Sequence, residues 1–547
     1  MRRAAALAAV AAAALAVPAA AWAHAALLKT FPAASQEVTT PPAQVRLVYD
    51  EVIEPRFAVV SVTDAAGHQE TSGPVERSAS DPYELVVPLK RIGEGWYLVF
   101  WRVISADGHP VRGAFTFSVG PNAGPAPQFV IPSLSETAAT PSLLTARWVM
   151  FLSMMAALGL FVLRAVIARP LVARVPGTRL RALAIAFGAA IAIALVATPV
   201  YVLMATAQFA LRSAWSIGVL LPLMHVSSFG RAYLDLELLL ALFAFAAGVA
   251  IWVDRPERPQ RSLAELLALL GALLAGGAAL LAPGAAGHAA QTAPRALSIV
   301  LDWIHLAAGS IWIGGLVGLL VLWWSTAVDR RTAGLAVVVP RFSNVAFFSV
   351  LALIGSGTGA ALLHLPTLAS LWETSYGTAV LVKVGLLTAA LVLASVNLFR
   401  TKPALEGPEP GPGPARALRG LVGGEAILVA AAIFAAAVLS SLPPPSSALA
   451  SIGKASAHTG PGPVSSVVVA NGYRIALHVL PNKAAVPNVF SVAITRGGKP
   501  VRNADVIGTF TMLDMEMPSQ SYRLAETAPG VYAHSGPALV FFRSPAS

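Results

Sequence analysis

The sequence predicts a multidomain membrane protein in which an all-α domain of about eight transmembrane helices joins two β-domains. Of its 547 residues, 56% are hydrophobic and only 12% are charged, and the mean hydropathy is +0.69. A chain of this composition is too apolar to be wholly water-soluble. Short strand-like segments occupy residues 24–120 and return at 465–547, on either side of the apolar runs at 144–442. Each outer segment therefore predicts a small antiparallel sandwich or barrel.

The first residues have the pattern of a secretory signal peptide. Residues 1–23 begin with two arginines, continue as an Ala/Leu/Val run and end in Ala21-Trp22-Ala23, a small-x-small cleavage site. An uncleaved anchor helix is the alternative. Cleavage exposes His24, whose α-amine and ring nitrogen can chelate one metal ion. Tetragonal coordination by such ligands suits Cu(II).

The N-terminal β-domain is expected over residues 24–120. Its predicted strands are β-branched or aromatic and are bounded by Gly, Pro or Asp, and they lie at 45–49, 57–62, 96–103 and 114–119. Residues 121–143 are rich in Pro, Ala and Ser and read as a linker.

Eight apolar runs between residues 144 and 442 are long enough to span a bilayer, which takes ~20 residues. Their cores lie at 146–168, 178–206, 232–253, 263–283, 297–324, 343–364, 376–399 and 419–442. Alternate loops carry the basic residues: Arg164, Arg169, Arg174, Arg179 and Arg181, then Arg255, Arg258 and Arg261, then Arg330, Arg331 and Arg341, then Arg400, Lys402, Arg416 and Arg419. The opposite loops hold only Arg212, Arg231 and Arg295. By the positive-inside rule the first set of loops is cytoplasmic and both termini lie outside.

A second linker is expected at 443–464 and a second β-domain at 465–547. Predicted strands lie at 465–469, 473–479 and 489–494. Further on, Met515 and Met517 share one strand face beside acidic residues. Two thioethers can receive Cu(I), although an alternating Met stripe is also a pattern of core packing.

Composition excludes several classes of function. The chain has no cysteine, which rules out a thiolate metal site and a disulfide. The net charge is +11, and the basic residues are distributed over short segments between the apolar runs. They do not form a basic patch with interspersed aromatic residues, so no nucleic-acid partner is expected. A P-loop is also missing from the sequence, which argues against ATP-driven pumping.

The most informative motif joins two predicted strands of the first β-domain. Asp107 and His109 are two residues apart, and in extended chain such side chains point to the same face. A turn aspartate that caps its own backbone is the simpler explanation of Asp107 alone. An exposed His24 makes convergence of the three residues on one ion the stronger interpretation.

The start His24-Ala25-Ala26-Leu27, the strand Trp101–Val103 and the segment Ser105–Gly113 resemble the CopC family of periplasmic copper-binding proteins. The resemblance implies a cupredoxin-like, Ig-like β-barrel that holds Cu(II) through the His24 amine and ring, Asp107 and His109. Some members of the family also carry a methionine-rich Cu(I) site. This domain contains no methionine after the signal peptide.

The membrane part resembles the CopD family through Asp302–Gly315 and through Tyr376-Gly377, Lys383 and Asn397–Arg400. The family often continues Asn-Arg where this chain has Asn397-Leu398. The resemblance implies copper passage into, or handling at, the inner membrane. In the last domain, Met512–Pro518 resembles the YtkA-like domain that follows CopD in some fused proteins.

Asp302 and His305 lie one helical turn apart in an apolar run, and an intramembrane ionisable pair is a functional-site hypothesis by default. A packing contact in which Asp302 only orients His305 is the alternative. All ten histidines fall outside or in the outer half of the predicted topology. The residues expected at the point where copper enters the membrane are His305, Asp302, Met204, Met224 and His225.

The sequence thus predicts a non-enzymatic copper homeostasis protein of the bacterial cytoplasmic membrane, with copper ions and the lipid bilayer as its partners. Cu(II) is captured outside and passed to the membrane domain for import or tolerance. One alternative is a tethered chaperone that hands copper to a respiratory oxidase or another periplasmic copper protein. Another is a copper or haem redox protein that uses His305 with His364.

Overall fold

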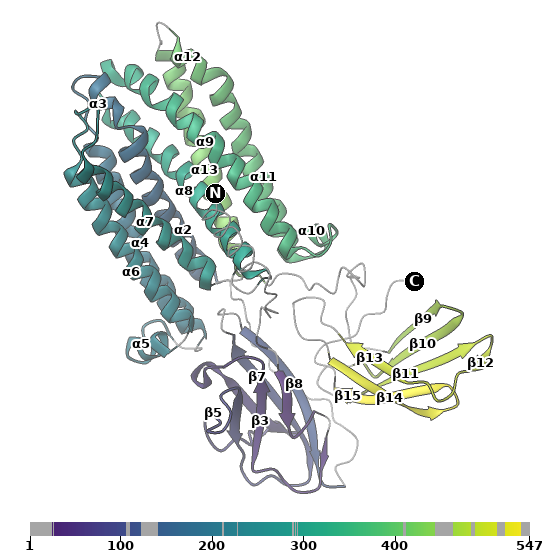
Figure 1. Cartoon of the computed structure of the whole chain (residues 1–547). Helices are drawn as coiled ribbons and strands as arrows, with labels where there is room; N and C mark the ends of the chain where they lie inside the picture. The colour runs from purple at the N-terminus through teal and green to yellow at the C-terminus, as the bar shows by residue number, and fades with distance from the viewer. Residues whose placement is uncertain are drawn as a thin grey trace, which may run out of the picture. The chain divides into compact units, whose positions relative to one another are not determined.

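The computed structural model describes residues 25, 27–34, 36–105, 110–121, 140–209, 213–226, 228–286, 289, 292, 294–407, 412–442, 463–482, 487–510 and 520–537. They form an N-terminal β-domain, a bundle of long helices and a C-terminal β-domain (Figure 1). This is the fold class that the sequence predicts.

The N-terminal β-domain consists of two four-stranded sheets. One sheet has the strand order β1-β3-β6-β5 and the other β2-β8-β7-β4. The strands are β1 (Leu27–Phe31), β2 (Glu37–Val38), β3 (Gln44–Tyr49), β4 (Val59–Asp64), β5 (Glu76–Arg77), β6 (Glu84–Pro88), β7 (Gly95–Ile104) and β8 (Pro110–Val119). The two long strands β7 and β8 pair along their whole length as an antiparallel hairpin.

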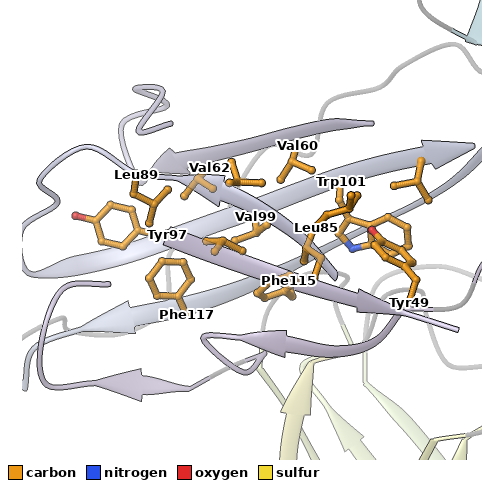
Figure 2. Packing of buried hydrophobic residues seen from close by; sticks show 14 of the residues in the cluster. Tyr49, Val60, Val62, Leu85, Leu89, Tyr97, Val99, Trp101, Phe115 and Phe117 are labelled. Carbon is orange, nitrogen blue, oxygen red and sulfur yellow. The ribbon is translucent and has the colours of Figure 1, made fainter. Parts of the chain in front are cut away.

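A single core fills the space between these sheets. In β3 the alternate residues Val45, Leu47 and Tyr49 are buried, as the period of two in a strand with one solvated face requires. Figure 2 shows Tyr49 beside Trp101 of β7 in this core, with Phe115 and Phe117 of β8. Burial of these large side chains accounts for most of the favourable free energy of folding in such a domain.

Eight helices in the described part of the chain are long and apolar enough to cross a membrane. These spans are Pro141–Arg174, Arg181–Phe209, Phe229–Val253, Leu263–Ala285, Arg295–Ser325, Val328–His364, Ser375–Glu406 and Gly413–Leu439. The corresponding helices are α2 (Pro141–Val162), α4 (Arg181–Phe209), α6 (Ser228–Val253), α7 (Leu263–Ala286), α8 (Arg295–Ser325), α9 (Val328–His364), α11 (Ser375–Val396) and α13 (Pro412–Leu439). All eight predicted spans are confirmed, and the chain is a multi-pass membrane protein.

Shorter helices complete this bundle. They are α3 (Pro170–Arg174), α5 (Ile217–Val226), α10 (Ser370–Glu373) and α12 (Lys402–Glu406). One π-helical turn, η2 (Leu163–Ile167), follows α2, and another, η4 (Asn397–Thr401), follows α11. Such turns widen a helix locally and are frequent at functional sites.

Glycines allow α2 and α8 to approach closely. A Cβ placed on Gly159 of α2 would meet the carbonyl oxygen of Ser310, and one placed on Gly314 of α8 would meet the Gly159 backbone. Small residues at a contact let two membrane helices pack backbone to backbone. Gly159 and Gly314 therefore permit the close contact of α2 with α8.

Two arginines share one buried carboxylate at one end of the bundle. Arg164 Nη1 and Arg169 Nε each lie 3.0 Å from an oxygen of Asp254 at the end of α6. Glu265 at the start of α7 accepts hydrogen bonds from the backbone N–H groups of Arg255 and Ser262. These contacts fix the turn between α6 and α7 to the end of the first span.

The C-terminal domain is a curled sheet of seven strands. Six follow the order β13-β14-β15-β11-β10-β9, and β12 pairs with β11. The strands are β9 (Val464–Ala470), β10 (Tyr473–Leu480), β11 (Pro487–Arg496), β12 (Lys499–Pro500), β13 (Val506–Phe510), β14 (Gln520–Ala528) and β15 (Val531–Pro537). Phe490 and Tyr532 are fully buried within it.

Candidate functional site

The β7–β8 hairpin carries the predicted Cu(II) ligands at its turn. Its last described pair is Ile104 opposite Pro110. Asp107 and His109 lie between these two residues, in a segment outside the described residues, and His24 also lies outside them. The ligand set therefore stays a prediction, and the structure supplies the positions of the neighbouring residues.

Those neighbouring residues belong to one core. Ala25, which follows His24 directly, is fully buried in the same cluster as Val103 and Val111 of the hairpin. In addition, Leu27 pairs with Tyr49, whose ring packs edge-on against Trp101 with centroids 5.7 Å apart. The start of the domain is thus anchored to the strands that lead into and out of the turn.

Trp101 stiffens this hairpin. Its side chain is fully buried, and a Cβ on Gly113 across the hairpin would lie 2.6 Å from its ring. The indole therefore fills the space that a side chain at Gly113 would need. The Trp101 Nε1 and Tyr49 hydroxyl are both buried without a partner among the described residues.

A polar cluster surrounds His305 inside the bundle. His305 Nδ1 lies 3.2 Å from Ser356 Oγ of α9, and Lys383 Nζ of α11 lies 3.2 Å from His305 Nε2. Since the Ser356 hydroxyl donates to the Ala352 carbonyl at 2.6 Å, it accepts from His305. This network assigns the proton to Nδ1 and leaves Nε2 as the acceptor of the Lys383 hydrogen bond.

Asp302 belongs to the same cluster. It lies one turn before His305 on α8 and interacts electrostatically with Lys383. A Cβ on Gly284 of α7 would come within 2.6 Å of Asp302 Oδ2, so the helix backbone approaches the carboxylate closely. The structure thus brings together the predicted Asp302 and His305, and adds Ser356 and Lys383 from other helices.

Both ring nitrogens of His364 have hydrogen-bond partners. Nδ1 donates to the Ala360 carbonyl at 2.7 Å, and Nε2 lies 3.1 Å from Thr292 Oγ1. The ring also stacks on Tyr376, with centroids 6.3 Å apart. With both of its nitrogens engaged, His364 offers little support for the alternative in which it ligates haem together with His305.

The remaining predicted membrane residues lie on other elements. Met204 is on α4, which packs through Phe187 against Phe161 of α2 and Phe243 of α6. Met224 and His225 are on α5, and the side chain of His225 lies outside the described residues. The described contacts of His305, in contrast, come from α9 and α11.

Two further observations limit the candidate sites. Among the described residues, no group of three or more His, Asp and Glu side chains lies close enough to hold a metal ion. Met515 and Met517 lie outside the described residues. Among the described residues, His305 and Asp302 are therefore not joined by a third such side chain.

Helix α13 carries a buried carboxyl group that was not predicted from the sequence. Glu425 is 3% exposed and accepts a hydrogen bond from Trp312 Nε1 at 2.6 Å. Asn397 Nδ2 lies 3.4 Å from its other oxygen. An acidic residue within an apolar run was the signal that could have revealed it.

The bundle also has a large apolar groove, whose lining includes Gly424 and Ala426 on either side of Glu425. Its volume is about 910 Å³, and residues of α2, α4, α8 and α13 line it. Ser153 and Arg419 are its polar lining residues. We assign it no role in metal binding, because thioether, imidazole and carboxylate groups are missing from its lining.

Three known families match successive parts of the chain. The CopC domain family matches residues 27–120, the Copper resistance protein D family residues 336–439 and the YtkA-like family residues 468–535. The order of the three matches agrees with the order of the three structural parts.

Individual proteins match as well. The chain is 27% identical over 532 residues to the copper transport protein CutJ of Bacillus subtilis, covering 94% of this chain and 91% of CutJ. It is 37% identical over 99 residues to protein YobA of Escherichia coli, covering 18% of this chain and 80% of YobA.

A solved structure resembles part of the chain. The crystal structure of CopC from Methylosinus trichosporium OB3b is 30% identical, covers 19% of this chain and 100% of its own, and has a whole-chain TM-score of 0.17. The three family matches, the full-length similarity to CutJ and the similarity to YobA show that the chain belongs to the CopC and CopD copper-resistance family, in the form that joins both domains to a YtkA-like domain.

Proposed function

We propose that this protein captures Cu(II) outside the cytoplasmic membrane and passes copper to a site around His305 in its membrane domain. His24, Asp107 and His109 form the capture site. Both termini lie on the outer side, as the distribution of basic loops predicts. The family to which the chain belongs and the full-length similarity to a copper transport protein support this function.

The observation that carries the capture site is the burial of Ala25 in the core that also holds Val103 and Val111. After signal cleavage, His24 is the residue directly before the buried Ala25. Its amine and ring then have little freedom to lose on binding, and preorganised ligands bind more tightly. Asp107 and His109 complete a set of nitrogen and oxygen ligands that suits Cu(II).

The membrane site has an occupant that copper must displace. Lys383 Nζ lies 3.2 Å from His305 Nε2. This ring nitrogen carries no proton, so its lone pair is the one with which His305 would bind a metal. An ammonium group and a metal cation compete for the same lone pair. Copper therefore reaches His305 only when the Lys383 side chain moves away, with Asp302 as the nearby anionic partner.

The capture site can be tested by electron paramagnetic resonance of the full chain loaded with one equivalent of Cu(II). We expect a tetragonal Cu(II) spectrum with nitrogen ligands. One extra residue before His24, or the substitution His109→Ala, abolishes that spectrum. His68→Ala is the matched control, because His68 is an exposed histidine of the same domain paired with Asp64 at 3.0 Å.

Equal spectra in the wild type and in both ligand variants would refute the capture site. A spectrum lost only in His68→Ala would move the site to the Asp64–His68 pair.

A further inference from the structure

We infer that Glu425 is a proton-carrying carboxyl group in the membrane domain, and that it loses its proton to water when a copper cation enters that domain. The second clause rests on the proposed function. Glu425 of α13 forms a cluster with Trp312 of α8 and Asn397 of the π-helical turn η4.

All three members of the cluster are buried. Glu425 is 3%, Trp312 1% and Asn397 8% exposed. Within the described residues, both contacts of the Glu425 carboxyl group come from neutral N–H donors, Trp312 Nε1 and Asn397 Nδ2. An ionised carboxylate deep in a membrane domain without a cationic partner is strongly unfavourable.

Several cationic and titratable side chains on the surrounding helices contact other groups. Helix α13 packs against α2, α8, α9, α11 and the two short elements after α11. On these elements Arg147 binds Tyr201 and Ser441, His305 binds Ser356 and Lys383, Arg341 binds the Val337 carbonyl and Lys402 binds Asn344. None of these four side chains is bonded to Glu425, whose described hydrogen bonds come only from Trp312 and Asn397.

Asn397 supplies the second, independent observation. Its Oδ1 is buried and has no partner among the described residues, while its Nδ2 lies at the long distance of 3.4 Å from Glu425. The Oδ1 and Nδ2 atoms of an asparagine are distinguished by their hydrogen bonds. The Asn397 amide can therefore also be placed in the orientation that exchanges these two atoms. In that orientation a proton on Glu425 Oε2 donates to Asn397 Oδ1, and Nδ2 takes the buried position that Oδ1 now occupies.

The cluster lies on the same helices as the His305 site. Trp312 is seven residues after His305 on α8, a rise of about 10 Å. Asn397 follows α11, which also carries Lys383. A copper cation at His305 adds to the positive charge that Lys383 already places on these helices, and the added charge favours the ionised carboxylate, because opposite charges still attract through a medium of low dielectric constant.

Infrared difference spectroscopy of the full chain in lipid nanodiscs tests the inference. We expect the carbonyl stretching band of a protonated carboxylic acid in the wild type, and its loss in Glu425→Gln. The glutamine keeps a carbonyl for Trp312 and an N–H for Asn397, so this variant is expected to fold. Glu237→Gln on α6 is the matched control, since it removes another glutamate of the membrane helices and leaves the Glu425 band in place.

Copper sulfate with ascorbate is then added, and bound copper is measured in the same samples. We expect the Glu425 band to disappear as copper binds. Identical spectra of the wild type and Glu425→Gln before copper is added would overturn the protonated state. A band that persists while copper is bound would overturn the release of the proton. Failure of the wild type to bind copper would overturn the proposed function and the release, whereas the band before copper still decides the protonated state.

Discussion

Lys383 and His305 lie on different helices and form a hydrogen bond of 3.2 Å, which makes the lysine a competitor of any cation at that histidine. A hydrogen bond that involves a charged group contributes ~1.5–3 kcal/mol. We therefore predict that Lys383→Met tightens copper binding at the membrane site by roughly 10- to 100-fold. Lys383→Arg, which keeps the positive charge, is expected to leave binding weak.

This prediction is measured by competition titration in the His109→Ala background, which removes the proposed capture site. His305→Ala in the same background sets the level of non-specific binding. Weaker binding in Lys383→Met would mean that the lysine supports the metal site instead of competing with the metal.

Asp64 gives the N-terminal domain a pH-dependent contribution to stability. Its pKa is lowered from 3.8, chiefly by the hydrogen bond with the His68 side chain. A carboxyl group with a lowered pKa stabilises the fold above its unfolded value, and the contribution is lost as pH falls through the folded value. Because the pair is exposed, Asp64→Asn is expected to cost only about 0.5 kcal/mol at neutral pH.

Hydrogen exchange of the β4 amides at neutral pH and at a pH below the lowered pKa measures this effect. The difference between wild type and Asp64→Asn should vanish at the lower pH. A difference that is the same at both values would assign the effect to packing.

The sequence predicted individual site residues where their type is unusual for their surroundings. Asp302 and His305 are ionisable groups in an apolar run, and the structure brings both into one cluster. Ser356 and Lys383 could not be assigned to that cluster, because they lie 51 and 78 residues further along the chain. Met204 and Met224 were grouped with His305 by membrane depth alone, and depth does not determine which helices are neighbours.

At the scale of elements, the contact of α2 with α8 depends on Gly159 and Gly314. We predict that Gly314→Ala lowers the free energy of unfolding by ~1–3 kcal/mol, because the added methyl group has no space. Gly271→Ala on α7 is the control, since a Cβ there meets nothing within 4 Å. Thermal unfolding in detergent compares the two variants, and equal unfolding temperatures would refute the close contact.

Element boundaries were less predictable than the elements themselves. The sixth span was predicted at 343–364, whereas helix α9 begins at Val328. Hydropathy detects only the apolar part of a helix, and the first turns of α9 carry Arg330 and Arg331. The cluster around Glu425 was also not predicted, because the sequence does not show that Trp312 and Asn397 lie beside it.

In the proposed function, the whole molecule combines an exported metal-capture domain with a membrane domain that holds ionisable groups around His305 and around Glu425. If His24 and His109 supply the metal and His305 receives it, the two domains act in sequence. Loss of either site then reduces net copper transfer. The basic loops further predict that transfer begins on the side on which both termini lie.

Copper uptake into proteoliposomes that contain the full chain tests this account most directly. A copper-sensitive indicator sealed inside the liposomes measures the copper that enters. Copper is added on the side of the membrane where both termini are predicted to lie. The account predicts uptake by the wild type and by His68→Ala, slower uptake at low copper by His109→Ala, and none by His305→Ala. Binding at the capture site without any uptake by the wild type would contradict transport and support a tethered chaperone.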